Sequence, residues 1–267
     1  MKRIINRLGI GPKTMLRDLG RKAGLEVRLS TIAVRDDLRL SSFLELFGID
    51  LVLDIGANKG QFAQDLWNSG YRGKIVSFEA LPDAHAQLSD AAASSDHSWT
   101  VARRVALSDR SGTAQFHVTK ADTASSLLSP GKEMVSSSPQ TGLAETIAVP
   151  TARLDEIIAE MNLPVANCFI KIDVQGAESL VMAGAPDTLA AAGGVMTELS
   201  LTSLYDGQPR AQEVLETIYQ AGFEVWDIWP GYRNPQTHRL NQIDVVCFKL
   251  GEISESPQGV AVLSAGA

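Results

Sequence analysis

The chain has 267 residues, of which 45% are hydrophobic and 21% charged, proportions typical of a globular protein. Its two cysteines, Cys168 and Cys247, each stand in an apolar run, so we expect buried thiols rather than a disulfide framework. The net charge of −7 is unevenly distributed, because residues 1–35 sum to +7 and the remaining chain to −14. An acidic body argues against nucleic acid as a partner.

Residues 1–48 are basic and amphipathic, and the sequence predicts a helical extension here. Such a segment could contact an anionic membrane surface, and a solvated arm is the alternative. No apolar run is long enough to span a bilayer, and charges interrupt any secretory signal. We therefore expect a cytoplasmic protein, with peripheral contact at the inner face of the membrane as an option.

Between residues 49 and 250, short β-rich runs alternate with helical stretches, which predicts a mainly parallel sheet covered by helices on both faces. The predicted strands are 51–54, 74–79, 99–107, 169–173, 194–199, 223–227 and 244–249. Helices are predicted over 61–68, from Pro82, from Ala177 and over 208–219.

Residues 108–150 break this alternation and are rich in Ser, Thr and Gly. We predict an inserted hairpin formed by the runs 113–119 and 145–150, with a loop over 120–144. Residues 251–267 are expected to form a mobile tail. The predicted organisation is thus one α/β domain over 49–250 between two terminal segments.

The most informative motif runs from Asp54 to Phe62, where a strand ends and a glycine-rich turn leads into a helix. Gly56 permits a tight turn, and Gly60 permits a close approach to the start of the helix. In open α/β sheets, ligands bind beyond the carboxyl ends of the strands. Asn58 stands where a dinucleotide fingerprint requires glycine, and the chain has no P-loop motif.

A second acidic residue, Glu79, ends the next predicted strand, 25 residues after Asp54. A carboxylate at this point can accept hydrogen bonds from both ribose hydroxyls of a nucleoside cofactor. NAD sites share this feature, so Glu79 alone does not identify the cofactor. Together, the two motifs are typical of the S-adenosylmethionine site of class I methyltransferases.

Several further segments resemble the FkbM family of methyltransferases, and the resemblance covers about residues 50–250. The matching segments are Asp54–Gly60, Phe78–Glu79, Ala106–Asp109 with Gly112, Thr151–Asp155, Ile170–Glu178 and Glu198–Ser200. One departure is Gln175, where the family more often has glutamate, and we expect it to matter less than Asp173 or Glu178.

The resemblance implies a Rossmann-like α/β fold, with a seven-stranded sheet whose last strand is antiparallel. It also implies O-methylation of a hydroxyl group on a sugar, glycolipid or natural-product acceptor. The residues expected to bind the cofactor are Asp54, Gly56, Ala57, Asn58, Gly60, Phe62, Glu79, Ala80, Ala106, Ser108, Asp109 and Asp173.

Three carboxylates are candidates for the chemistry, because methyl transfer to a hydroxyl requires removal of its proton by a side chain or activation by a metal ion. Asp173 ends a predicted strand beside the expected cofactor site, Glu198 ends the next, and Glu178 begins a helix. We predict Asp173 as the base or as a ligand of Mg²⁺, with Glu198 as a second ligand and Glu178 as a helper. The alternative for Glu178 is a capping role at the helix N-terminus.

The acceptor is expected to lie against loops, and His238 and Tyr232 in the polar loop 230–241 are the candidate contacts. Two other functions stay open. An NAD-dependent oxidoreductase or epimerase is opposed by Asn58 and by the absence of a Tyr-x-x-x-Lys pair. A non-catalytic scaffold with a methyltransferase fold is opposed by the retained acidic residues. The sequence does not predict the oligomeric state.

Overall fold

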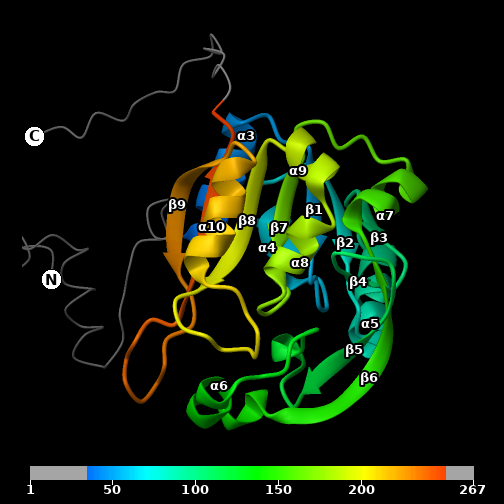
Figure 1. Ribbon diagram of the computed structural model, residues 1–267. Helices are drawn as coiled ribbons and strands as arrows, with labels where there is room; N and C mark the ends of the chain where they lie inside the picture. Colours follow the sequence, from blue (N-terminus) through cyan, green and yellow to red (C-terminus); the bar gives the residue numbers. More distant parts are fainter. Residues whose placement is uncertain (1–34, 251–267) are drawn as a thin grey trace, which may run out of the picture.

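The computed structural model describes residues 35–250, which form a seven-stranded and a three-stranded sheet (Figure 1). The large sheet has the order β3-β2-β1-β7-β8-β10-β9. Its strands are β1 (Leu51–Ile55), β2 (Lys74–Phe78), β3 (Trp99–Val101), β7 (Phe169–Ile172), β8 (Gly194–Ser200), β9 (Glu224–Pro230) and β10 (Gln242–Phe248). Neighbouring strands from β3 to β8 are parallel, whereas β10 is antiparallel to both β8 and β9. This topology confirms the predicted seven-stranded sheet with an antiparallel last strand.

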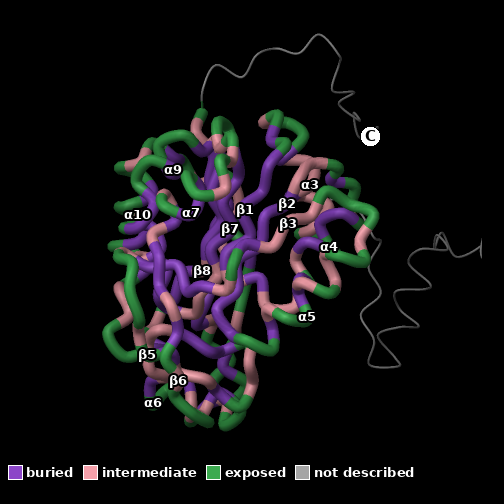
Figure 2. The backbone as a smooth tube through the Cα atoms, turned by 90° about the vertical axis from the view of Figure 1, so that its right-hand side faces the viewer, coloured by how far each residue is buried: buried purple, intermediate pink, exposed green. Residues whose placement is uncertain are grey.

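Helices cover both faces of the large sheet (Figures 1 and 2). One face carries α3 (Asp36–Leu46), α4 (Gln61–Asn68) and α5 (Pro82–Ala93); the other carries α7 (Leu154–Met161), α8 (Glu178–Ala183), α9 (Pro186–Ala191) and α10 (Ala211–Gln220). The alternation of side chains along β1 explains the two layers, because Leu51 and Leu53 pack in one hydrophobic core and Val52 in the other. Figure 2 shows the resulting buried band along the central strands.

The predicted strand 99–107 is wrong as a single element. Its first part is β3 in the large sheet, whereas its last part is β4 (Ala106–Leu107), which pairs with β6 in the small sheet. Residues 102–105 separate the two parts and pass the end of β2, where the Val105 amide donates to the Glu79 carbonyl. This change of sheet places Ala106 beside the carboxyl end of β2.

The small sheet has the order β4-β6-β5 and combines β4 with the hairpin of the inserted segment. Its strands β5 (Gly112–Thr119) and β6 (Leu143–Ala152) pair as an antiparallel hairpin. They include the runs 113–119 and 145–150, from which the sequence predicts a hairpin. The stretch between them is not an irregular loop throughout, because it contains η1 (Asp122–Ala124), α6 (Lys132–Ser137) and η2 (Pro139–Thr141). The Gly131 amide donates to the Leu204 carbonyl at 2.7 Å, which attaches this stretch to the loop after β8.

Two predictions lie largely outside the described residues. These are the basic helical extension over 1–48, of which only residues 35–48 are described, and the tail over 251–267. No helix within residues 35–250 has the length and apolarity needed to cross a membrane. Both cysteines are free and buried, as expected.

Candidate active site

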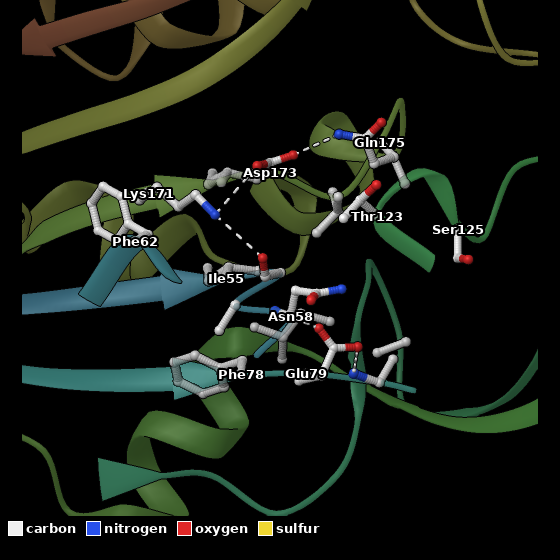
Figure 3. Close-up of a pocket in the computed structure, with 18 of the residues that line it drawn as sticks. Ile55, Asn58, Phe62, Phe78, Glu79, Thr123, Ser125, Lys171, Asp173 and Gln175 are labelled. Carbon is white, nitrogen blue, oxygen red and sulfur yellow. Dashed lines mark hydrogen bonds and ion pairs between the residues drawn. The ribbon is translucent and has the colours of Figure 1, made fainter. Parts of the chain in front are cut away.

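A cavity of about 450 Å³ lies at the carboxyl ends of β1, β2 and β7, next to the inserted segment (Figure 3). Such a volume is within the usual range for a small-ligand site. Lys171 and Asp173 lie at one end of the cavity and Glu79 at the other, with Thr123 and Ser125 contributed by the insert. Of the predicted site residues, Gly56, Ala57, Asn58, Phe62, Glu79, Ala80, Ala106 and Asp173 line the cavity.

The two glycines of the motif are required by packing within the protein. Gly56 has φ = +76°, and a Cβ atom there would lie 1.9 Å from the carbonyl oxygen of Asp173. Gly60 has φ = +88°, and its Cβ atom would lie 2.4 Å from the Trp99 ring. The prediction that Gly60 allows a close approach therefore applies to a side chain of β3, and Gly60 itself does not line the cavity.

Glu79 is held rigidly at the apolar end of the cavity and is only 7% exposed. One carboxylate oxygen accepts hydrogen bonds from the amides of Ala80 and Leu81, at 2.8 and 2.7 Å, and the other accepts from the Asn58 amide at 2.8 Å. Burial raises the pKa of Glu79, and these three amides oppose that shift. A carboxylate offers about four acceptor positions, so one position remains on the oxygen that faces Asn58.

The wall next to Glu79 is apolar. It is formed by Phe78, Ala80, Leu81, Val105, Ala106, Leu107, Phe116 and Leu127. An apolar wall beside one fixed acceptor suits a nucleoside, whose base is flat and weakly polar and whose ribose donates hydrogen bonds. The residues present at this end therefore fit the adenosine part of S-adenosylmethionine.

The opposite end is organised by Lys171, a buried lysine to which the sequence analysis gave no role. Lys171 of β7 is paired in register with Asp54 of β1. Its Nζ atom lies 3.3 Å from Asp54 Oδ1 and 3.4 Å from Asp173 Oδ2, and it donates to the Gly56 carbonyl at 3.2 Å. Burial would lower the pKa of Lys171, but Asp173 and Asp54 raise it above its ordinary value. The sequence contained a signal for this ion pair, because a lysine within an apolar predicted strand is rarely buried without an acidic partner.

Asp54 therefore supports the site from behind and does not line the cavity. It is fully buried, and burial raises its pKa while Lys171 lowers it. Asp173, by contrast, has a side chain that is 41% exposed. Of the two carboxylates that contact Lys171, Asp173 is the one open to a ligand.

Gln175, the departure from the family pattern, contacts Asp173. It has φ = +58°, lines the cavity, and donates from its amide nitrogen to Asp173 Oδ1 at 2.7 Å (Figure 3). The same nitrogen lies 3.5 Å from Glu198 Oε2, and the hydroxyl of Tyr205 lies 2.9 Å from the amide oxygen. A glutamate here would place another carboxylate against Asp173, whereas the amide supplies the donor that Asp173 needs.

Glu178 and Glu198 do not line the cavity. One oxygen of Glu178 accepts from the amides of Gly176 and Val174, at 2.9 and 3.3 Å, so Glu178 shapes the turn before α8, in line with the structural alternative for this residue. Glu198 accepts a short hydrogen bond from the side chain of Gln242. Burial raises the pKa of Glu178 to about 7, and burial together with Asp173 raises the pKa of Glu198 well above its ordinary value.

The pKa of Glu178 leads to a prediction about stability. Because its pKa is raised in the folded state, the stability linked to its proton is present below the ordinary pKa of 4.5 and is lost as the pH rises through about 7. We expect the Glu178→Gln variant to escape this loss, so that its free energy of unfolding gains up to about 3 kcal/mol relative to the wild type between pH 4.5 and pH 8. Urea unfolding at the two pH values measures the gain. A difference that is the same at both, as expected for the exposed control Glu145→Gln, would contradict the prediction.

The predicted Mg²⁺ site at Asp173 and Glu198 is not supported. No group of three His, Cys, Asp or Glu side chains among residues 35–250 is arranged to hold a metal ion. The physical reason is visible in the contacts of Gln175, whose amide nitrogen lies between the two carboxylates and donates to Asp173.

The predicted acceptor contacts lie elsewhere. Tyr232 donates from its hydroxyl to Ser137 Oγ at 3.0 Å and packs beside Met134 of α6, and His238 is exposed in the loop between β9 and β10. Neither lines the cavity, whereas Asp122, Thr123, Ser125 and Leu127 of the insert do. Ser108 and Asp109 also lie outside the cavity wall, where the Ser108 hydroxyl donates to the Asp109 carboxylate at 3.1 Å.

The chain matches a known family model and a curated relative. The family model described as the methyltransferase FkbM domain matches residues 54–225. The 2-O-methyltransferase NoeI of Sinorhizobium fredii is 31% identical over 175 residues, which cover 63% of this chain and 70% of NoeI.

Among solved structures, the chain is similar to fibrillarin of Aeropyrum pernix with bound S-adenosylmethionine, at a TM-score of 0.43 and 13% identity over 79% of this chain and 72% of that one. It is also similar to a TehB-like methyltransferase of Corynebacterium glutamicum, at a TM-score of 0.40 and 14% identity over 88% and 94% of the two chains. The family match covers Glu79 at one end of the cavity and Lys171 and Asp173 at the other, together with the glycine-rich turn. The chain therefore belongs to the family of FkbM-domain methyltransferases, as its sequence predicted, and is an S-adenosylmethionine-dependent enzyme.

Proposed function

We propose that the protein transfers the methyl group of S-adenosylmethionine to a hydroxyl group of a carbohydrate or a similar natural-product acceptor, with Asp173 as the general base. The observation that carries the proposal is the Asp173 carboxylate, which is partly exposed and lines the cavity that also contains Glu79. The similarity to NoeI, a 2-O-methyltransferase, supports a hydroxyl oxygen as the acceptor atom.

When bound, S-adenosylmethionine supplies a methyl group that is already electrophilic, so the protein must align the acceptor and remove its proton. Gln175 and Lys171 each contact a different oxygen of Asp173, which fixes the plane of the carboxylate. The free positions on these oxygens are then available to a hydroxyl that enters the cavity. Asp173 would take the hydroxyl proton as the carbon–oxygen bond forms.

The inserted segment supplies the other requirement, a site shielded from water. Asp122 of η1 forms an ion pair with Lys59 of the glycine-rich turn, at 2.8 Å. Ser126 donates to the Val174 carbonyl at 3.1 Å, next to Asp173. The insert is thus attached to the glycine-rich turn and to the chain after β7, and we propose that it, rather than the loop 230–241, selects the acceptor.

The proposal can be tested with S-adenosylmethionine carrying an isotopically labelled methyl group and a panel of neutral sugars, amino sugars and glycolipids. We expect an O-methylated product together with S-adenosylhomocysteine, and no loss of rate with EDTA because no step of the proposal uses a metal ion. Mass spectrometry and NMR of the product locate the methyl group. Methyl transfer to nitrogen, or a rate that requires Mg²⁺, would contradict the proposal. The glycolipids in the panel test whether the acceptor is attached to a lipid.

A further inference from the structure

The side chain of Gln175 has a hydrogen-bond partner at each end of its amide. The nitrogen donates to Asp173 Oδ1 at 2.7 Å and lies 3.5 Å from Glu198 Oε2 (Figure 3). The oxygen lies 2.9 Å from the hydroxyl of Tyr205. A carboxylate accepts hydrogen bonds and an amide oxygen needs a donor, so these neighbours fix the orientation of the amide. Tyr205 is the donor that holds the oxygen.

Tyr205 is suited to act as a permanent donor. Its side chain is fully buried, and its ring packs against Gly176, where a Cβ atom would lie 2.8 Å from the ring. Burial, together with the charge of Glu198, raises the pKa of Tyr205 above its ordinary value. The hydroxyl therefore keeps its proton at neutral pH and can donate it to a hydrogen bond.

The same hydroxyl also contacts the inserted segment. It lies 3.0 Å from the carbonyl oxygen of Ala124 in η1, and the neighbours of Ala124 on either side, Thr123 and Ser125, line the cavity. A phenol has one hydrogen, so the Ala124 carbonyl and the Gln175 amide oxygen share it. The hydroxyl thus joins the part of the insert that lines the cavity to the side chain that holds Asp173.

The backbone around Tyr205 is attached to the insert as well. The Asp206 amide donates to the Ser129 carbonyl at 2.9 Å, and the Gly131 amide donates to the Leu204 carbonyl at 2.7 Å. These bonds lie directly before and after Tyr205 in the loop that follows β8. The position of the ring is therefore set by the contact between this loop and the insert.

We propose that Tyr205 is a positioning residue for the base. Its hydroxyl holds the amide of Gln175, which in turn orients Asp173, and its contact with Ala124 makes this orientation depend on the docking of the insert. The inference rests on the proposed methyl transfer with Asp173 as the base. Tyr205 does not line the cavity, so it acts only through Gln175. Misplacement of a reacting group by about 1 Å can cost about 100-fold in rate, so such support affects kcat.

The experiment uses Tyr205→Phe, which keeps the ring and removes only the hydroxyl. We expect kcat for labelled methyl transfer to fall about 10- to 100-fold, because the amide of Gln175 is then held at one end only. Affinity for S-adenosylhomocysteine, measured by calorimetry, should change less than about threefold, because Glu79 and its contacts lie at the other end of the cavity.

The matched control is Tyr232→Phe. It removes a hydroxyl from the same hydrophobic cluster, but this hydroxyl donates to Ser137 Oγ at 3.0 Å and contacts no residue of the cavity wall. We expect its kcat and its affinity for S-adenosylhomocysteine to stay within about twofold of the wild type.

A double variant separates positioning from a purely structural role. If Tyr205 acts through Asp173, removal of its hydroxyl should have no further effect once the base is absent. We therefore expect the kcat of Tyr205→Phe combined with Asp173→Asn to lie within about threefold of Asp173→Asn alone. The labelled methyl group makes these low rates measurable. Losses that multiply in the double variant would show two independent effects and would overturn the inference.

The outcomes distinguish this inference from the proposed function. A wild-type kcat in Tyr205→Phe, or an equal loss in Tyr232→Phe, overturns the inference and leaves Asp173 as the base. A wild-type kcat in Asp173→Asn overturns the proposed base and the inference with it.

A second variant covers the case in which Tyr205→Phe does not fold. Gln175→Asn interrupts the same contacts from the middle, because its side chain is one carbon shorter and cannot reach both Asp173 and Tyr205. Asparagine also tolerates the left-handed backbone of this position, where φ is +58°. The same loss of kcat and the same lack of further effect in the Asp173→Asn background are expected. A folded Gln175→Asn protein with a wild-type kcat would overturn the inference.

Discussion

The Glu79→Ala variant is expected to bind S-adenosylhomocysteine at least about 100-fold more weakly than the wild type. The carboxylate accepts three backbone hydrogen bonds, from Asn58, Ala80 and Leu81, and keeps one acceptor position for a ribose hydroxyl. Its removal deletes the ligand contact and also leaves three buried amide donors without partners. We therefore expect the free energy of unfolding to fall as well, by about 2 kcal/mol or more.

A matched variant separates these two effects. Glu79→Gln keeps one oxygen for Ala80 and Leu81 but turns an amide nitrogen towards the Asn58 amide, so we expect about tenfold weaker binding with a smaller loss of stability. Isothermal calorimetry with S-adenosylhomocysteine and urea unfolding measure the two quantities. Wild-type affinity in a folded Glu79→Ala protein would show that the cofactor does not bind at this end of the cavity.

The cofactor half of the site could be predicted because it depends on local chain geometry. Gly56 and Glu79 stand at the ends of consecutive parallel strands, and the ends of such strands meet at one edge of a sheet. The sequence spacing therefore fixes their proximity. What the sequence could not provide was the number of acceptor positions left on Glu79, because this depends on backbone amides that approach only in the folded turn.

The other half depends on contacts between segments that are distant in the sequence. Lys171 and Asp54 meet because β1 and β7 are neighbours, although 117 positions separate them. Gln175 meets Tyr205 through loops that follow two different strands, and Asp244 faces the cavity because β10 is inserted beside β8. Positions at strand ends and at a helix start predicted Glu178 and Glu198 in the site together with Asp173. Glu178 is instead buried and hydrogen-bonded to the turn before α8, and Glu198 accepts from Gln242, so neither lines the cavity.

The short helices of the insert could not be predicted from its composition. Its Ser-, Thr- and Gly-rich composition predicts a loop over 120–144. The structure has short helices there instead, and hydrogen bonds and an ion pair attach the segment to the rest of the protein. The ties are the Gly131–Leu204 hydrogen bond, the Lys59–Asp122 ion pair and the Ser126–Val174 hydrogen bond. Local composition contains no information about such partners. It is these ties that bring Thr123 and Ser125 into the cavity wall.

The Asp173→Asn variant is expected to lose about 10²- to 10⁴-fold in kcat, the range that a general base contributes. Asparagine can still accept from Gln175, but it cannot take the hydroxyl proton, and its amide would turn towards Lys171 Nζ. Lys171 keeps Asp54 as a partner, so we expect the fold to be retained. Because the loss is chemical, affinity for the neutral S-adenosylhomocysteine should change less than about threefold.

The control for this prediction is Asp122→Asn, which makes the same substitution in the same cavity wall but in the insert, away from Lys171. Loss of the Lys59 ion pair should loosen the insert and raise the KM for the acceptor. The kcat should change by less than about fivefold, because the proposed base, Asp173, is unchanged. Steady-state kinetics on an acceptor identified from the labelled-methyl panel measure both variants. A kcat of Asp173→Asn near the wild-type value would show that Asp173 is not the base, because asparagine cannot take the proton. A loss of kcat in Asp173→Asn and a rise of KM in Asp122→Asn would separate proton removal from acceptor binding. Together, these two results would place the reacting hydroxyl beside Asp173, at the end of β7.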